Sequence, residues 1–362
     1  MSTTAQYSPR ILRVGACVVP FNVRLVVGIL ITLVITVLVA VWALTQGSYS
    51  LTMGQVAAVF TGSGTHIQRT VVLEMRLGRV LVAIVVGAAL GYAGALTQNV
   101  ARNALASPDI LGITQGASLA AASTIIFAGA GTGGIVEASA SGLMSTVGVP
   151  GAAILGAVIT ALVVWLVSGA PKSSMIHVVL IGVAASIFFS AATTWILAYA
   201  QLDRAASARM WLTGSLNGRD FNHLWIPLAV VLCAVAAAGW IAFQLAALTL
   251  GETTATVLGL RVRRVQLVHL LTAVVLTAVA VAATGPIGFI AFVCPHLARM
   301  LANTPAPPLL FSAVLGGCVL LIADQVARVV LPWELPVGVV TSVVGAPFLL
   351  YMIIRTRRLE SI

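Results

Sequence analysis

Ten long apolar runs account for most of this chain. Each meets or approaches the length of about 20 helical residues that crosses a hydrocarbon core about 30 Å thick. They cover approximately residues 25–45, 77–98, 109–128, 148–168, 175–200, 224–247, 266–284, 286–301, 309–330 and 337–355. A soluble domain is excluded, because only 8% of the 362 residues are charged whereas soluble domains carry about 25%. We therefore expect an all-α integral membrane protein.

The run at 286–301 is short, so a broken or re-entrant element is an alternative to a full span there. We expect residues 1–24 to form a cytoplasmic N-terminal segment, residues 25–355 the transmembrane domain, and residues 356–362 a cytoplasmic tail. Gly87, Gly91 and Gly94 place small residues on one face of the second run, which favours close packing of helices in lipid.

The cationic residues predict how the chain is oriented. With the N-terminus inside the cell, twelve of the 19 Lys and Arg residues fall inside and seven outside, in agreement with the positive-inside rule. An even number of spans then also places the C-terminus in the cytoplasm. Most of the net charge of +10 is explained by topology, so we expect no nucleic-acid partner.

Several chemistries are absent from the sequence. The single lysine, Lys172, follows Pro171, so the chain lacks the G-K-[ST] end of a phosphate-binding loop and does not hydrolyse ATP by itself. Its four cysteines stand alone, without metal-ligand spacing. Ser118 lies near mid-membrane without a histidine at similar depth, which disfavours an intramembrane serine protease. We therefore expect no catalytic residue and no metal site.

Four segments, in order along the chain, carry a family signature. They are Ala101–Ser118, Gly285–Arg299, Ala323–Arg328 and Glu334–Pro347. These segments are similar to the motifs R-N-P-L-A-x-P-x-x-L-G-x-x-x-G-A, G-P-I-x-F-x-x-L-x-x-P-H-x-x-R, A-D-x-x-A-R and E-L-P-x-G-x-x-T…G-x-P. Those motifs belong to the permease subunits of vitamin B12 and ferric-siderophore ABC importers, which have the type II importer fold. Ala104 and Phe292 depart from the motifs, where the family usually has Pro and Leu.

Within that family the segment Trp211–Gly218 most resembles one of the two paralogous permeases of ferric-enterobactin-type importers. The resemblance implies a permease subunit that moves a ferric siderophore from a binding protein into the cytoplasm and catalyses no bond change. A permease for vitamin B12 or haem is the alternative. A proton-coupled secondary transporter is a more distant one, because Asp324 is the one acid within a span.

The resemblance also implies partners and a location. The chain pairs with a second permease, a paralogue rather than itself, and with two cytoplasmic subunits that bind ATP and Mg. An extracytoplasmic siderophore-binding protein and membrane lipid complete its surroundings. The chain itself binds no cofactor, and it is a multi-pass protein of the bacterial cytoplasmic membrane.

The cytoplasmic segment at about 251–260 is too polar to span the membrane and is bounded by glycines, so we expect a short surface helix. The resemblance implies that it is the coupling helix, which docks on the ATP-binding subunit. The alternative is a solvated loop whose arginines set topology. The residues assigned to coupling are Gly251, Glu252, Thr253, Ala255, Leu258, Gly259, Arg261, Arg263 and Arg264.

Three arginines mark the outer face. Arg76 and Arg79 are three residues apart and share one helical face, and Arg328 lies at the outer end of the ninth run. The resemblance implies that they dock glutamates of the binding protein. The alternative is arginines that extend to the membrane surface from helix ends. Asp324, four residues before Arg328, predicts a local ion pair that stabilises an outer gate.

Polar residues in the fifth and tenth runs mark a candidate translocation pathway, because the resemblance implies that these spans of two permeases face each other across the channel. The alternative is that the hydroxyls bond their own helices. The assigned residues are Ser186, Ser190, Thr193, Thr341, Ser342 and Gly345.

Overall fold

The computed structural model describes residues 10–14, 17–47, 49–128, 143–169, 175–330 and 333–360, and nearly all of them are helical. A two-stranded antiparallel hairpin, β1 (Arg10–Val14) and β2 (Cys17–Phe21), precedes the helices and was not expected from the sequence. The α-helices are α1 (Val23–Thr45), α2 (Met53–Phe60), α3 (His66–Arg69), α4 (Leu77–Ala101), α5 (Ile113–Ala128), α6 (Leu143–Val167), α7 (Met175–Tyr199), α8 (Leu202–Leu212), α9 (Trp225–Ala236), α10 (Ala238–Thr249), α11 (Glu252–Val257), α12 (Val262–Thr284), α13 (Ile290–Ala302), α14 (Leu309–Val329) and α15 (Val337–Glu360). A π-helical turn, Thr70–Arg76, joins α3 to α4, and two short 3₁₀ turns lie at Pro108–Leu111 and Phe221–His223.

The predicted spans correspond to these helices. Six helical segments in the described part of the chain are long and apolar enough to cross a membrane: Val23–Thr45, His66–Ala101, Gly148–Val167, His177–Tyr199, Val262–Thr284 and Leu309–Val329. A bent pair and three shorter apolar helices, α5, α13 and the first part of α15, account for the other four runs. The all-α membrane fold is therefore confirmed.

Two of the predicted spans have an interrupted form. The run at 224–247 is two helices, because α9 and α10 meet at Ala237 with a bend of 56°. The run at 286–301 contains a helix of 13 residues, α13, which begins only at Ile290. The residue before it, Phe289, has a left-handed backbone with φ of 67°. Helix α15, which corresponds to the tenth predicted run, extends through most of the predicted tail, to Glu360.

Helix α4 is the centre of the bundle and packs against α12, α13 and α14. Its glycines permit this contact. A Cβ atom at Gly87, Gly91 or Gly94 would lie only 1.7–2.3 Å from a backbone oxygen of α13 or α14, which is far inside van der Waals contact. The predicted small-residue face is confirmed, and it accounts for an 83% buried helical segment at the centre of a lipid-exposed bundle.

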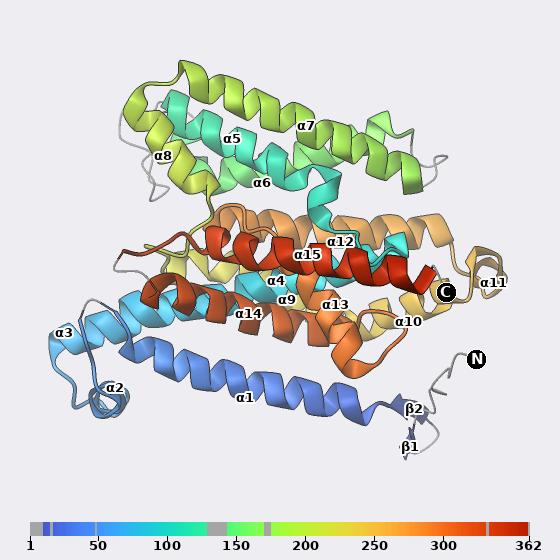
Figure 1. Ribbon diagram of the computed structural model, residues 1–362, viewed down its shortest axis with the longest axis horizontal. Helices are drawn as coiled ribbons and strands as arrows, with labels where there is room; N and C mark the ends of the chain where they lie inside the picture. Colours follow the sequence, from blue (N-terminus) through green and yellow to red (C-terminus); the bar gives the residue numbers. More distant parts are fainter. Residues whose placement is uncertain are drawn as a thin grey trace.

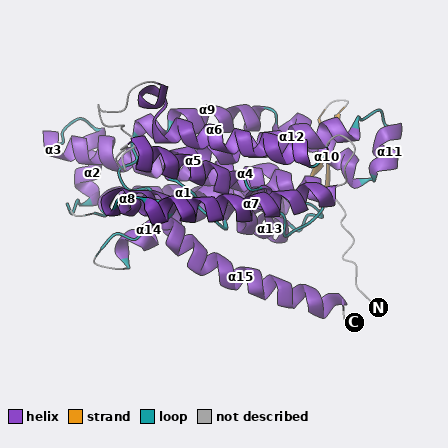
Figure 2. Cartoon of the chain, turned by 90° about the horizontal axis from the view of Figure 1, so that it is seen from above, coloured by secondary structure: helices purple, strands orange, loops and turns teal. Residues whose placement is uncertain are grey.

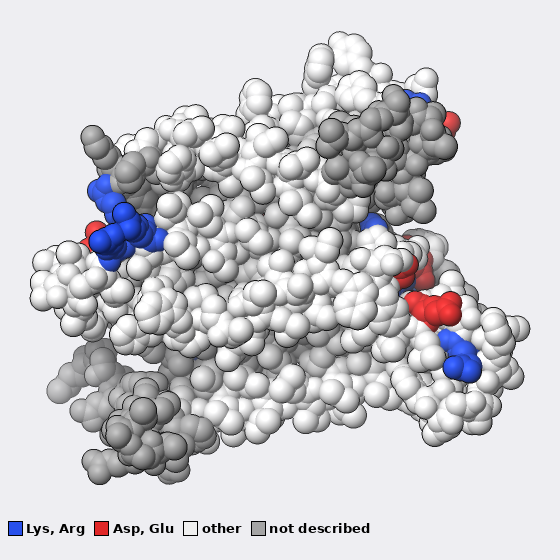
Figure 3. All heavy atoms as spheres, turned by 180° about the vertical axis from the view of Figure 1, so that it is seen from behind, with Lys and Arg blue, Asp and Glu red and all other residues white. Residues whose placement is uncertain are grey.

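The ends of the bundle differ in what they present. The start of α1, the end of α15 and the short α11 lie together at one end, and α2, α3 and α8 lie at the other (Figure 1). Helix α15 diverges from the bundle on the side away from α9, α10 and α12 (Figure 2). In the view of Figure 3 the charged side chains gather at the two ends, and the surface between them is uncharged. Such a surface suits contact with lipid.

Candidate functional site

The segment assigned to coupling forms a short helix, as expected. Helix α11 begins after Gly251, whose φ is +103°, and ends near Gly259, whose φ is +87°. These two glycines supply the left-handed backbone that turns the chain out of α10 and back into α12. Figure 1 shows α11 projecting beyond the end of α12. The helix therefore lies at the very end of the bundle, where its outer side is accessible to another protein.

The side chains of α11 divide into an inner and an outer set. Ala255 is fully buried in the core of this chain, so it anchors the helix and is not available for docking. Val257 and Leu258 are 83% and 61% exposed. Val257 had no sequence signal as a site residue, because a helix of six residues is too short to reveal which face is buried. The exposed pair forms an apolar tip.

Charged groups flank the apolar tip. Arg261, Arg263 and Arg264, at the start of α12, are all exposed. Glu252, which opens α11, accepts a hydrogen bond from the Gln266 amide at 3.4 Å. We call the exposed residues Val257, Leu258, Arg261, Arg263 and Arg264 the α11 surface. It combines an apolar centre with a cationic border.

At the opposite end of the bundle a cavity of about 490 Å³ opens beside α4 and α14. Four arginines and three acids line it: Arg76, Arg79, Arg219, Arg328, Glu74, Asp220 and Glu334. We call it the arginine cavity. The structure thus brings together the three arginines that were assigned to docking, although they come from distant parts of the chain.

The Arg76 side chain forms its hydrogen bonds within this chain. Its side chain is only 6% exposed. The guanidinium donates hydrogen bonds to the carbonyl oxygens of Leu44 at 2.7 Å and Tyr49 at 2.5 Å. These contacts tie the end of α1 and the loop after it to α4. In this conformation Arg76 therefore positions the rim of the cavity.

Arg79 carries the strongest electrostatic contacts in the cavity. Its Nη2 lies 2.8 Å from Oδ1 of Asp324, its Nε lies 3.1 Å from Oδ2 of the same carboxylate, and its Nη1 lies 3.1 Å from Oε2 of Glu334. The bidentate geometry fixes the guanidinium plane. Arg79 is thus paired on both sides.

The predicted ion pair between Asp324 and Arg328 is wrong. The Asp324 residue is fully buried and its carboxylate pairs with Arg79, because α14 packs directly on α4. Arg328, one turn further along α14, instead donates to the carbonyl oxygen of Gln46 at 3.0 Å, and its Nε lies 3.8 Å from Glu334. Since that Nε has no hydrogen-bond partner, Arg328 retains capacity for another acceptor.

Arg219 is a member of the cavity that the sequence did not single out. It is 7% exposed, one of its Nη atoms donates to Nε2 of His223 at 3.0 Å, and its buried Nε has no partner. Because Nε2 accepts, the His223 proton lies on Nδ1 and is donated to Asp220 at 2.8 Å. Burial lowers the pKa of the Arg219 guanidinium, and Asp220 partly offsets this effect.

Most of the residues assigned to the translocation pathway make their contacts within this chain. Ser186, Thr193, Thr341 and Ser342 each donate a hydroxyl hydrogen bond to a carbonyl of their own helix or its first turn. A Cβ at Gly345 would lie 2.2 Å from the Phe289 ring of this chain, so Gly345 packs inward. Ser190 is exposed on α7. The assignment remains a prediction.

Helices α7 and α15 nevertheless share one property, which is that both expose large apolar side chains. Only 11% of the α7 span is buried, and its Ile187, Phe188 and Trp195 are at least 65% exposed. On α15, Val343 and Val344 are exposed to a similar extent.

In the described part of the chain, no group of three or more His, Cys, Asp and Glu residues is placed to hold a metal ion.

Six helices that are long and apolar enough to cross a membrane, in the part of the chain that the structure describes, define a multi-pass membrane protein. The chain belongs to the FecCD transport family, whose profile matches residues 32–355. Proteins of this family are transport components and not enzymes.

Curated relatives cover almost the whole chain. The ferric enterobactin transport system permease protein FepG of Escherichia coli is 34% identical over 92% of this chain and 98% of its own length. The corresponding protein FepD of Escherichia coli is 37% identical over 91% of this chain and 95% of its own length. The iron(3+)-hydroxamate import system permease protein FhuG of Bacillus subtilis is 33% identical over 90% and 96%, respectively.

A solved structure supports the same assignment. A metal-chelate type ABC transporter in an inward-facing conformation matches with a TM-score of 0.77 and 27% identity, and the match covers 90% of this chain and 98% of that one. The predicted family and fold are thereby confirmed.

Proposed function

We propose that this chain is the transmembrane permease subunit of an ATP-driven importer that passes a ferric siderophore from a binding protein into the cytoplasm. One observation carries the proposal: two surfaces suited to protein partners lie at opposite ends of an apolar helical body. They are the α11 surface and the arginine cavity. This arrangement lets an event at one end be transmitted along rigid helices to the other.

The α11 surface supports docking of an ATP-binding subunit. Two exposed apolar side chains at the tip, Val257 and Leu258, supply the apolar centre that protein interfaces favour. The exposed arginines beside them select an acidic border on the partner. ATP and Mg bind to that subunit, and α11 receives its closure as a rigid displacement, since Ala255 locks the helix onto the bundle.

The arginine cavity supports docking of the binding protein. Arg328 and Arg79 lie within reach of a single carboxylate, because Glu334 already contacts both of them. The Glu334 side chain is 40% exposed, so a carboxylate from outside can replace it. Charge-assisted pairs of this kind fix the orientation of a partner and increase its association rate.

A second permease would cover α7 and α15. Both helices expose apolar side chains along their length, and α15 stands apart from the bundle (Figure 2). A paralogue is favoured as partner, since FepG and FepD of one organism both resemble this chain. The channel then forms between the α7 and α15 helices of the two subunits, with Ser190 on an exposed face of α7.

The orientation follows from the charges. The end of the bundle with α11 carries Arg261, Arg263 and Arg264, together with the start of α1 and the end of α15. We assign this end to the cytoplasm of a bacterial cell and the arginine cavity to the outer side of its membrane. Both termini are then cytoplasmic.

Ferric siderophore is proposed as cargo because relatives that match over nearly their whole length carry ferric enterobactin or iron(3+)-hydroxamate in their names. Vitamin B12 and haem are the alternative cargoes. Co-purification from native membranes tests the importer class. An ATP-binding subunit should co-purify with the chain and be lost when residues 252–260 are replaced by a Gly-Ser linker. Its absence from the wild-type preparation would instead favour a secondary transporter.

A further inference from the structure

A groove of about 830 Å³ runs along the membrane face between the bent pair α9–α10 and helix α12. The 56° bend between α9 and α10 lies at Ala237, which is one of the residues that line the groove. Buried residues form its floor, among them Ala234, Ile241 and Val265. Trp240, with two-thirds of its surface exposed, forms part of one wall. We call this hollow the α10–α12 groove.

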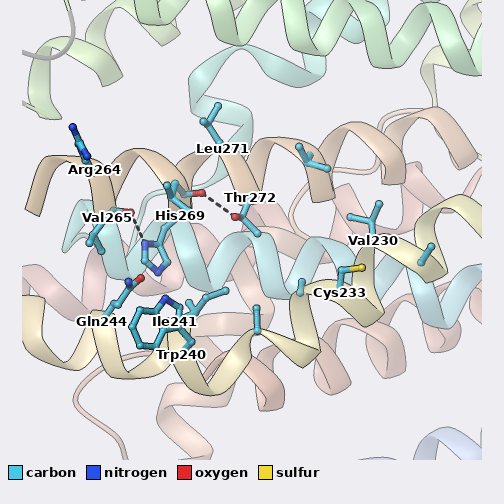
Figure 4. A pocket seen from close by; sticks show the side chains of 15 residues that line it. Val230, Cys233, Trp240, Ile241, Gln244, Arg264, Val265, His269, Leu271 and Thr272 are labelled. Carbon is cyan, nitrogen blue, oxygen red and sulfur yellow. Dashed lines mark hydrogen bonds between the residues drawn. The ribbon is translucent and has the colours of Figure 1, made fainter. Parts of the chain in front are cut away.

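The groove has one polar end. Figure 4 shows Arg264 on the rim at the first turn of α12, and Gln244 and His269 close together between α10 and α12. His269 is fully buried, and its Nδ1 donates to the carbonyl oxygen of Val265. Its Nε2 is buried without a hydrogen-bond partner. The polar side chains that reach the groove surface at this end are therefore Arg264, which is exposed, and Gln244, which is half-buried.

The other end of the groove is apolar, and the length of the groove indicates how deep it extends into the membrane. From Arg264 the groove follows α12 to Val275, which at 1.5 Å per helical residue is about 16 Å. Half of a hydrocarbon core about 30 Å thick is about 15 Å. The groove therefore extends from the membrane surface at Arg264 to the middle of the bilayer. This is the depth of one leaflet.

The charge of the rim selects the occupant. Arg264 lines the groove, and none of the lining residues is acidic. Basic pockets between helices on the cytoplasmic side favour anionic phospholipid head groups. The helices that line the groove, α9, α10 and α12, lie on the side of the bundle away from α15 (Figure 2), so a second permease packed on α15 leaves the groove open to lipid.

We propose that the α10–α12 groove binds a single anionic phospholipid of the cytoplasmic leaflet. The phosphate pairs with Arg264, and the Gln244 amide donates to an ester carbonyl. One acyl chain lies along Ile241 and Val268 toward Val275. Because Arg264 follows α11 by seven residues, the lipid also fixes the root of the α11 surface to the membrane.

Lipid retention tests this directly. The purified chain is exchanged into mixed micelles containing equal amounts of phosphatidylglycerol and phosphatidylcholine, and bound lipid is counted by native mass spectrometry. We expect one retained phosphatidylglycerol per chain. Arg264→Gln should lower its retention about fivefold, as expected for the loss of one cation–lipid contact. The matched variant Arg263→Gln removes an exposed cation that does not line the groove and should leave retention unchanged.

A second variant separates the groove from general adhesion of lipid. Cys233 is exposed and lines the groove, so Cys233→Trp fills the acyl path without touching the cationic rim. It should reduce retention of phosphatidylglycerol, because the acyl chain no longer has room. Equal retention of the two lipids by the wild type, or equal losses in the Arg264 and Arg263 variants, would overturn the proposal. Thermal unfolding of each variant checks that the fold is intact.

Discussion

Arg79 and Asp324, which are 245 positions apart in the chain, form a bidentate ion pair with an Nη2–Oδ1 distance of 2.8 Å at the outer end of the bundle. The carboxylate is almost completely shielded from solvent, with 1% of its side chain exposed. The pair joins α4, the central helix, to α14. Its second function is to hold the Arg79 guanidinium in a plane from which Nη1 reaches Glu334.

Asp324→Asn should destabilise the protein by about 3–5 kcal/mol, because it leaves the Arg79 cation buried without its main counter-charge. Thermal unfolding of the purified protein measures this. The matched variant Asp220→Asn removes a carboxylate whose side chain is 46% exposed, and we expect a change of about 0–1 kcal/mol. Equal stability of the two variants would show that the buried pair does not hold the helices together.

Two variants of the arginine cavity should act in opposite directions on the binding protein. Arg328→Glu reverses the charge that a partner carboxylate needs and should weaken docking by at least about tenfold. Glu334→Gln removes the resident carboxylate that contacts Arg79 and Arg328, so docking should strengthen by up to about fivefold. Surface plasmon resonance with the chain in nanodiscs measures both. Weaker docking in the Glu334 variant would mean that this side chain contributes to the interface and does not compete for it.

The α11 surface yields a prediction with an internal control. Val257→Asp places a charge at the exposed apolar tip and should abolish co-purification of the ATP-binding subunit, because desolvating an unpaired carboxylate in an interface is costly. The same preparation should dock the binding protein as the wild type does, since the arginine cavity lies at the other end of the bundle. Undiminished co-purification would place the contact elsewhere.

Close packing around α4 predicts a sharp difference between two glycines. Gly94→Ala would bring a Cβ within 1.7 Å of the Ala291 carbonyl oxygen and should destabilise the protein by at least about 1–3 kcal/mol. Gly239→Ala, in α10, meets no atom within 4 Å and should be neutral or stabilising by up to about 1 kcal/mol. Denaturation of both variants in the same detergent compares them. A tolerated Gly94→Ala would show that α13 can shift away from α4.

The helices were predictable from the sequence because lipid permits few alternatives. An apolar run of about 20 residues, such as the one that became α1 or α14, has to satisfy its backbone internally and therefore becomes a helix. The glycine face of α4 was predictable for a related reason, since small residues at a spacing of three to four have few other uses in lipid. The bend at Ala237 was not, because no proline marks it.

The side-chain contacts of the candidate site were harder to predict from the sequence. Spacing placed Arg328 one turn from Asp324, whereas the packing of α14 on α4 selected Arg79 as the partner. Local spacing cannot reveal a contact across 245 positions. Arg219 was missed for the same reason, because only the fold brings its loop to the cavity. Ala255 was wrongly assigned to docking. Its burial depends on how α11 packs against the bundle, which the sequence does not show.

Uptake of labelled cargo by whole cells tests the central proposal most directly. Cells that lack this chain should lose uptake of radio-iron-labelled ferric siderophore and recover it when the chain is supplied from a plasmid, and their uptake of labelled cobalamin should not change. Normal siderophore uptake in the deletion strain, with loss of cobalamin uptake, would contradict the assigned cargo.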